Sequence, residues 1–220
     1  NIEKEEDCMK KLELQKCIVG SVYTNCYFLK NKETGELLIV DPGDEAKRIK
    51  KFIEDQELHP VAILLTHGHF DHVMAVDSVR TAYHIPVYAA EAEKETMQDA
   101  SINLSINMGG AMLSVEADHW LKDGETITLL DQEVRCILTP GHTVGGMCFY
   151  FPKAGMLFSG DTLFQESVGR TDFPGGSMSE IVRSIREKLF VLPDAVQVYP
   201  GHGLMTSIKN EKMFNPFAVE

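Results

Sequence analysis

The segment THGHFDH, residues 66–72, places His67, His69, Asp71 and His72 directly after the apolar run VAILL. Imidazole and carboxylate groups in one cluster are suitable ligands for Zn, Fe or Mn. Metal-binding histidines on one helix face would be three or four residues apart, so a spacing of two indicates a turn whose side chains converge on a point. The alternative is a polar loop in which Asp71 caps a helix. The density of histidines favours the metal site.

Three more candidate ligands follow apolar runs later in the chain. EVRCILTPGH ends on His142, MLFSGD ends on Asp161, and VQVYPGH ends on His202. Each alone fits an ordinary turn, because Pro-Gly pairs favour turns and aspartate caps turns and helices. Strand ends that lead into loops are nevertheless where sites gather in layered α/β folds. Together the four segments supply seven ligands, enough for two metal ions. The other histidines lack this setting: His59, His84 and His119.

The hydrophobic pattern predicts the elements that would position these loops. A helix is expected over residues 44–57, with Asp44 as its cap, and further helices over 73–83 and 91–100. Residues 101–116 show no clear period and are expected to form a loop or lid. Short apolar runs predict strands at 12–20, 21–29, 35–41, 61–65, 86–89, 127–130, 133–139, 146–151, 156–161 and 196–200, and a helix is expected with Ile181, Ile185 and Leu189 on one face.

The composition is that of an ordinary soluble globular protein, with 44% apolar and 25% charged residues. A net charge of -12 argues against nucleic-acid and anionic-membrane partners. Five cysteines without a CxxC pair suggest neither a disulfide framework nor a thiolate zinc site. The charged start and the lack of a run of about 18 apolar residues predict a cytoplasmic protein. We expect an N-terminal extension at residues 1–8 and a single domain over residues 9–220.

The motifs THGHFDH, TPGHT, SGDT and PGHG, in this order, resemble those of the metallo-β-lactamase superfamily over nearly the whole chain. The resemblance implies a four-layer αβ/βα sandwich with the metal site at one edge. It also implies that Asp161 bridges two metal ions. Asp41, in VDPG, would accept a hydrogen bond that fixes the orientation of a ligand imidazole. A turn residue before Pro42 is the other interpretation of Asp41. By position, one ion would have the ligands His67, His69 and His142, and the other Asp71, His72 and His202.

Within the superfamily, SGDTLF, VGRTDFPGGS and NPF most resemble the glyoxalase II-like hydrolases, which cleave thioesters of glutathione. This implies two divalent ions, with Zn favoured over Fe or Mn, and a small-molecule thioester of the hydroxyacylglutathione type as substrate. Arg170 would contact the anionic part of that substrate. Thr171 and Asp172 stand where glyoxalase II has aromatic residues, and no further helical domain follows, so a compact single-domain subtype is expected.

The expected reaction is attack of a metal-bridging hydroxide on the thioester carbonyl, with Asp71 orienting the hydroxide and Asp161 bridging the ions. One alternative is a persulfide dioxygenase that binds a single Fe(II) through His67, His142 and Asp161. Another is a non-catalytic metal-binding scaffold on the same fold. The sequence does not define the oligomeric state.

Overall fold

Two six-stranded sheets form the centre of the computed structural model, which describes residues 11–218. The first sheet has the order β1-β2-β3-β4-β5-β6. Its first three strands are antiparallel, whereas β3 to β6 run parallel. The predicted extension at residues 1–8 lies outside the described residues. The strands are β1 Leu12–Val19, β2 Thr24–Asn31, β3 Glu36–Val40, β4 His59–Leu64, β5 Val87–Ala90 and β6 His119–Leu121.

The second sheet has the order β14-β13-β10-β9-β8-β7. Both β8 and β10 pair antiparallel with β9, and β13 pairs parallel with β10. Consequently β8, β10 and β13 end at the same edge of the sheet. Its strands are β7 Thr126–Leu129, β8 Gln132–Leu138, β9 Met147–Phe151, β10 Met156–Gly160, β13 Gln197–Pro200 and β14 Thr206–Ser207, and a separate hairpin is formed by β11 Leu163–Phe164 and β12 Ser167–Val168.

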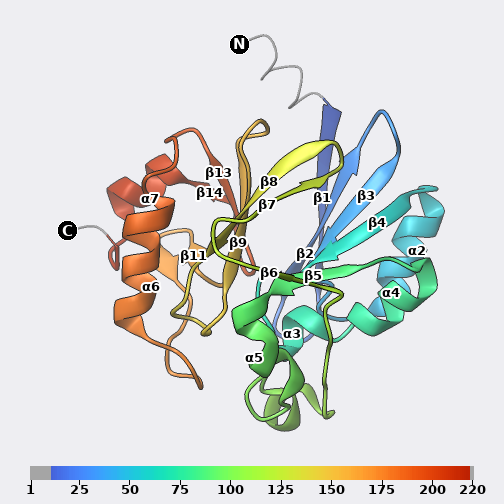
Figure 1. Ribbon diagram of the computed structural model, residues 1–220, viewed down its shortest axis with the longest axis horizontal. Coiled ribbons are helices and arrows are strands. Elements are labelled where there is room, and N and C mark those ends of the chain that lie inside the picture. Colours follow the sequence, from blue (N-terminus) through green and yellow to red (C-terminus); the bar gives the residue numbers. More distant parts are fainter. Residues whose placement is uncertain (1–10, 219–220) are drawn as a thin grey trace.

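Helices cover the outer face of each sheet, so the molecule has four layers (Figure 1). On the first sheet lie α2 (Ala46–Asp55) and α4 (Val76–Tyr83). On the second sheet lie α6 (Met178–Ser184), the π-helical turn η3 (Ile185–Leu189) and α7 (Ile208–Phe214). The predicted αβ/βα sandwich is confirmed. The remaining short helices are α3 Phe70–Val73, η1 Glu91–Glu93, α5 Lys94–Gln98 and the π-helical turn η2 Ser105–Gly109.

Strand β3 shows why the sheets pack in this way. Leu37 and Ile39 belong to the apolar cluster beneath α2 and α4, whereas Leu38 and Val40 belong to the cluster between the two sheets. Alternate side chains of a strand point to opposite faces, and all four side chains are fully buried. A continuous run of apolar residues is therefore what a strand covered on both faces requires.

Three expectations for the helices need correction. The residue before helix α2 is Glu45, in a left-handed conformation and without a capping hydrogen bond from its side chain. Asp44 instead accepts a hydrogen bond from the neighbouring Glu45 N–H at 2.6 Å. The helix expected over 73–83 is two helices, α3 and α4, and the one expected over 91–100 is η1 followed by α5. The expected loop at 101–116 contains the turn η2. The helix carrying Ile181, Ile185 and Leu189 continues into η3, and all three residues are fully buried as expected.

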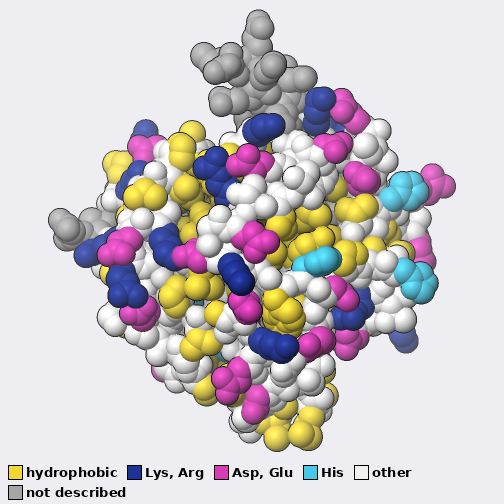
Figure 2. Space-filling model, in the orientation of Figure 1, with side chains coloured by type: hydrophobic (Ala, Val, Ile, Leu, Met, Phe, Trp, Pro, Cys, Tyr) yellow, Lys and Arg dark blue, Asp and Glu magenta, His cyan; other side chains and the backbone are white. Residues whose placement is uncertain are grey.

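The surface carries both signs of charge. Lys and Arg side chains are interspersed with Asp and Glu side chains on the face shown in Figure 2. Among residues 11–218, we find no helix with the length and apolar character that crossing a bilayer requires.

Candidate metal centre

The four candidate ligand segments meet at one edge of the sandwich. The loop of residues 65–69 follows β4 and leads directly into α3, so His67 and His69 lie in the loop and Asp71 and His72 in the helix. His142 follows β8, Asp161 follows β10 and His202 follows β13. These last three strands end at the same edge of the second sheet, and α3 lies between the two sheets at the lower side of the view (Figure 1). The structure therefore brings together all seven sequence-predicted ligands.

The ligand atoms form three overlapping groups, each small enough to hold a cation: His67, His69 and His142; His67, His72 and Asp161; and Asp71, His72 and His202. In the first group His69 Nδ1 lies 2.9 Å from His142 Nε2. Asp161 lies between the groups, because its two carboxylate oxygens are each 3.5 Å from an imidazole nitrogen, Oδ1 from His72 and Oδ2 from His142. This position agrees with the bridging role that the resemblance implies.

Unpaired polar atoms test whether these residues fit a metal. Within the described part of the chain, four buried side-chain atoms have no hydrogen-bond partner: His67 Nε2, His69 Nε2, His72 Nε2 and Asp161 Oδ1. Each such atom costs about 1–3 kcal/mol if nothing binds it. The four residues that carry these atoms all belong to the three groups, and nitrogen with carboxylate oxygen is the ligand set of Zn, Fe or Mn. The residues present fit divalent cations.

Hydrogen bonds at Nδ1 of three imidazoles determine which ring nitrogen faces the site. His72 Nδ1 donates to Asp41 Oδ2 at 3.0 Å, and His142 Nδ1 donates to the main-chain carbonyl of Arg170 at 2.7 Å. His67 Nδ1 lies 3.2 Å from Thr66 Oγ1, which itself donates to Asp41. In each ring the Nε2 lone pair is thereby left for the centre of the site, as in carboxylate-supported metal sites.

Asp41 links two of these rings to one carboxylate. It is 1% exposed, and its Oδ1 accepts a bond from Thr66 N–H at 2.8 Å. Its Oδ2 accepts bonds from Thr66 Oγ1 at 2.6 Å and from His72 Nδ1. Its backbone φ of 51° is left-handed, a conformation that aspartate tolerates better than most residues. The side chain is placed for the supporting role that the resemblance implies.

The electrostatics of the site are those of a cation-binding centre. Burial lowers the pKa of His67 and His69, the latter to about 3, so both rings stay neutral and can coordinate. Burial alone would also lower the pKa of His72, but the carboxylates of Asp71, Asp161 and Asp41 raise it to about 10. The carboxylates therefore require positive charge at this position, which a divalent cation supplies.

Two side chains at the site carry no signal in the sequence. Thr24, at the start of β2, donates its hydroxyl to Asp71 Oδ2 at 2.7 Å. Glu93 is 1% exposed and accepts hydrogen bonds from the loops on either side of the first ligand group. Burial raises the pKa of Glu93 to about 7, against the lowering effect of its hydrogen bonds. An isolated threonine in a strand and an acidic residue in a helix are too common for the sequence to single them out.

A cavity of about 340 Å³ opens over the ligands. Its wall is mostly apolar and includes Phe70, Leu104, Met108, Phe164 and Phe173. Arg170 also lines it, but the Arg170 guanidinium makes two hydrogen bonds to Asp172, both of 2.7 Å, and lies 3.9 Å from the centre of the Phe173 ring. The predicted substrate-binding residue is thus at the cavity with its charge already paired.

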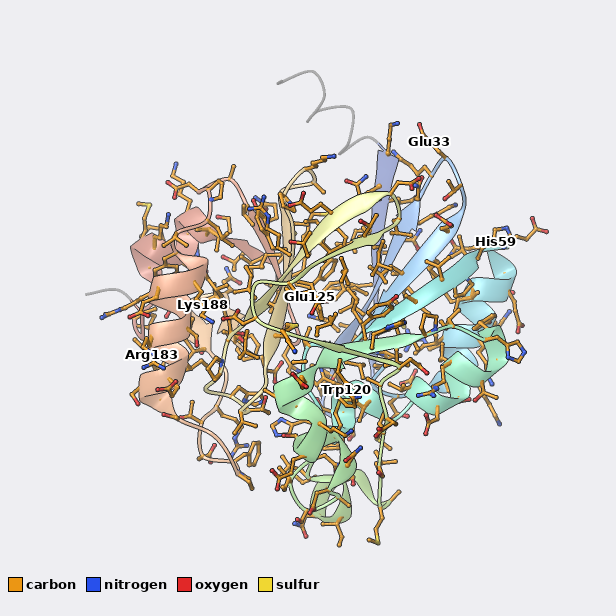
Figure 3. All side chains as sticks on the ribbon, viewed as in Figure 1. Glu33, His59, Trp120, Glu125, Arg183 and Lys188 are labelled. Carbon is orange, nitrogen blue, oxygen red and sulfur yellow. The ribbon has the colours of Figure 1, made fainter. Side chains whose placement is uncertain are left out.

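The remaining histidines lie elsewhere. His59 is at the start of β4, at the opposite end of that strand from His67, and on the outer side of the molecule (Figure 3). His84 ends α4 in a left-handed conformation, and His119 stacks on Tyr88 with ring centroids 4.4 Å apart. None of the three joins a cation-sized group among the described residues.

Fold and site together define a metal-dependent hydrolase architecture, and the sequence comparison agrees. The model of the metallo-beta-lactamase superfamily matches residues 19–202, and the chain belongs to this superfamily. The predicted resemblance is confirmed, and the family's fold is one that binds metal ions.

Two curated relatives align over most of the chain. The probable metallo-hydrolase YqgX of Bacillus subtilis is 40% identical over 200 residues, which are 90% of this chain and 94% of YqgX. The hydroxyacylglutathione hydrolase GloC of Haemophilus influenzae is 34% identical over 203 residues, which are 90% of this chain and 94% of GloC. The chain thus aligns with nearly the full length of both relatives.

Two solved structures are similar in both fold and sequence. The BLEG-1 B3 metallo-beta-lactamase superposes with a TM-score of 0.90 at 38% identity, covering 94% of this chain and 100% of that chain. TTHA1623, solved in a di-iron-bound form, superposes with a TM-score of 0.81 at 33% identity, covering 92% of this chain and 99% of that chain.

Proposed function

We propose that this protein is a dinuclear metallohydrolase that cleaves a thioester of the hydroxyacylglutathione type. The observation that carries the proposal is that three cation-sized groups overlap beneath a largely apolar cavity, with the Asp161 carboxylate 3.5 Å from imidazoles of His72 and His142. Similarity to GloC supports the thioester as substrate class. The di-iron form of TTHA1623 supports two ions per site, and zinc is our choice of metal because imidazoles predominate among the ligands.

Two divalent cations, when bound, would lower the pKa of a shared water to about 7 and polarise the thioester carbonyl. The ligands of one ion would be His67, His69 and His142, and those of the other Asp71, His72 and His202, with Asp161 shared. The thiol that leaves has a pKa of about 8.5, so it can depart as a thiolate without a general acid.

The chain's own residues orient the reacting groups. Thr24 donates to Asp71 Oδ2, and His202 Nε2 lies 3.2 Å from the same oxygen. Asp71 Oδ1 is thereby left for the reacting water, whose proton it would accept while the carbonyl is attacked. The apolar wall formed by Phe70 and Phe173 would keep bulk water away from the carbonyl.

A covalent route through a cysteine is not supported by the described residues. Among those that line the cavity there is no cysteine. Cys148 is fully buried in the second sheet, and burial raises the pKa of its thiol to about 11, although hydrogen bonds to Thr139 and Thr162 lower it. A thiolate nucleophile needs an accessible thiol with a lowered pKa.

The direct test is metal analysis of the purified protein followed by thioester assay. We expect two transition-metal ions per chain and release of free thiol from S-lactoylglutathione, measured with a thiol-reactive dye. A single iron per chain, with oxygen uptake that depends on a persulfide, would instead establish the dioxygenase. Metal-loaded protein that releases no thiol and consumes no oxygen would leave the metal-binding scaffold as the remaining alternative.

A further inference from the structure

Glu93 is a buried carboxylate that connects two ligand loops from opposite halves of the molecule. It ends the short helix η1, which follows β5 of the first sheet. Its Oε1 accepts a hydrogen bond from Gly68 N–H at 2.9 Å. Its Oε2 accepts bonds from Gly145 N–H at 2.7 Å and from the Thr143 hydroxyl at 3.0 Å.

These donors belong to the two loops that carry the first ligand group. Gly68 stands between His67 and His69, and Thr143 directly follows His142. The carboxylate thus contacts the main chain between His67 and His69 and, in the other loop, the hydroxyl of the residue after His142, although its partners are 25 to 52 residues away in sequence. Neither Gly68 nor Gly145 binds metal itself, so Glu93 acts one step behind the ligands.

Close packing shows that the two loops rest directly on the Glu93 segment. A Cβ atom added to Gly145 would lie 2.3 Å from Glu93 N and 2.5 Å from Glu93 Oε2. A Cβ atom added to Gly68 would lie 2.7 Å from Met97 Cγ, one turn further along the same segment. Real Cβ atoms do not approach so closely, so both positions require glycine.

Burial of a carboxylate is unfavourable in free energy, so a buried glutamate indicates a specific structural role. Glu93 is 1% exposed, and no ion-pair partner of Glu93 is present among the described residues. Burying an unpaired charge costs several kcal/mol unless hydrogen bonds satisfy it. Only an acceptor with two oxygens can receive donors from both loops at once, and a neutral apolar residue could fill the space without connecting them.

We propose that Glu93 is a positioning residue that holds the His67–His69 loop and the His142 loop in register, so that three imidazoles meet around one cation. The inference rests on the metal site of the proposed function and does not depend on the thioester as substrate. Glu93 touches no ligand nitrogen. Its effect on a bound ion is therefore transmitted through the main chain of Gly68 and Gly145.

The test compares Glu93→Gln with Glu211→Gln. Glutamine keeps the shape of Glu93, but its amide NH2 would face Gly68 N–H or the Gly145 and Thr143 donors. Glu211 is an equally buried carboxylate that accepts bonds from Thr206, Asn210, Asn215 and Glu166 N–H, and none of these is a ligand-loop residue of the first group. It controls for the general cost of disturbing a buried carboxylate.

The measurements are zinc affinity, by competition with a chromophoric chelator, and melting temperature with and without zinc. For Glu93→Gln we expect zinc to bind about 10–100-fold more weakly at one of the two positions, the size typical of residues that orient ligands. The rise in melting temperature on adding zinc should shrink accordingly. For Glu211→Gln the metal-free protein should melt earlier, with the zinc-induced rise unchanged.

A milder variant keeps the test decisive if Glu93→Gln does not fold. Thr143→Val removes the hydroxyl donor of the His142 loop to Glu93 while preserving side-chain shape, and we expect zinc to bind about 3–10-fold more weakly. The inference is wrong if Glu93→Gln, or Thr143→Val in its place, binds two zinc ions with wild-type affinity. If the wild-type protein itself binds no zinc or other transition metal, the proposed function fails first.

Discussion

Replacing Asp41 with asparagine would test how strongly the site depends on groups that do not bind metal. Asp41 receives three donors, Thr66 N–H, Thr66 Oγ1–H and His72 Nδ1–H, at 2.8, 2.6 and 3.0 Å. Asparagine has nearly the same shape and tolerates the left-handed backbone of this position. Its NH2 group, however, cannot accept, so in either orientation of the amide at least one buried donor loses its acceptor.

The expected loss of stability in Asp41→Asn follows from the number of buried donors that lose their acceptor. One buried donor without a partner costs about 1–3 kcal/mol. In a domain of this length, each kcal/mol lowers the melting temperature by about 2–4 °C, so a loss of about 2–12 °C is expected. If the unpaired donor is His72 Nδ1–H, the ring can turn or change tautomer, and metal affinity should fall by about 10–100-fold.

The assay is thermal unfolding of metal-free and zinc-loaded protein, with zinc affinity measured separately. Asp55→Asn is the control, because Asp55 is exposed and pairs with Lys51 across one helical turn. Exposed pairs of this kind contribute little to stability, and that small contribution should not depend on zinc. Wild-type zinc affinity in Asp41→Asn would refute the idea that the carboxylate fixes the His72 ring.

Other perturbations address the remaining parts of the site. Asp161→Ala should lower the metal content from two ions per chain to one or none and abolish hydrolysis, as measured by metal analysis and thiol release. Chelation of wild-type protein should lower the melting temperature by several degrees, and zinc should restore it. Asp172→Asn removes the carboxylate that pairs Arg170, so KM for an anionic thioester should fall severalfold with kcat unchanged. Gly201→Ala places a Cβ 2.2 Å from Asp161 Oδ1, so metal content should fall although the protein still folds, as judged by circular dichroism.

The sequence indicated which side chains would meet at the site because several of them follow a strong local pattern. His67, His142, Asp161 and His202 all follow apolar runs, and a strand that is buried on both faces must end where its chain becomes polar. The parallel direction of β8, β10 and β13 then brings the last three of these residues to one edge. The first step needs only the hydrophobic pattern, whereas the second depends on strand pairing that only the fold shows.

The supporting residues could not be predicted in the same way. Thr24 and Glu93 act through contacts with residues 25 to 52 positions away. The residues next to them in the sequence form no pattern that predicts these contacts. The expected cap at Asp44 failed for the converse reason, since a suitable residue type was present but the chain turned one residue later, at Glu45. For Arg170, local sequence showed a cation, whereas only the fold shows that Asp172 already pairs it.

The glycines of the motifs have a structural role that the sequence alone does not explain. A Cβ added to Gly43 of VDPG would lie 1.6 Å from the Asp71 carbonyl oxygen, and one added to Gly169 of VGRTDF would lie 1.7 Å from that of Asp161. At each place one loop lies against the main chain of another loop that carries an aspartate of the site. Because any side chain would push these loops apart, the glycines set the spacing of the site as directly as the ligands set its chemistry. Residues that bind nothing thus decide whether those that bind metal can meet.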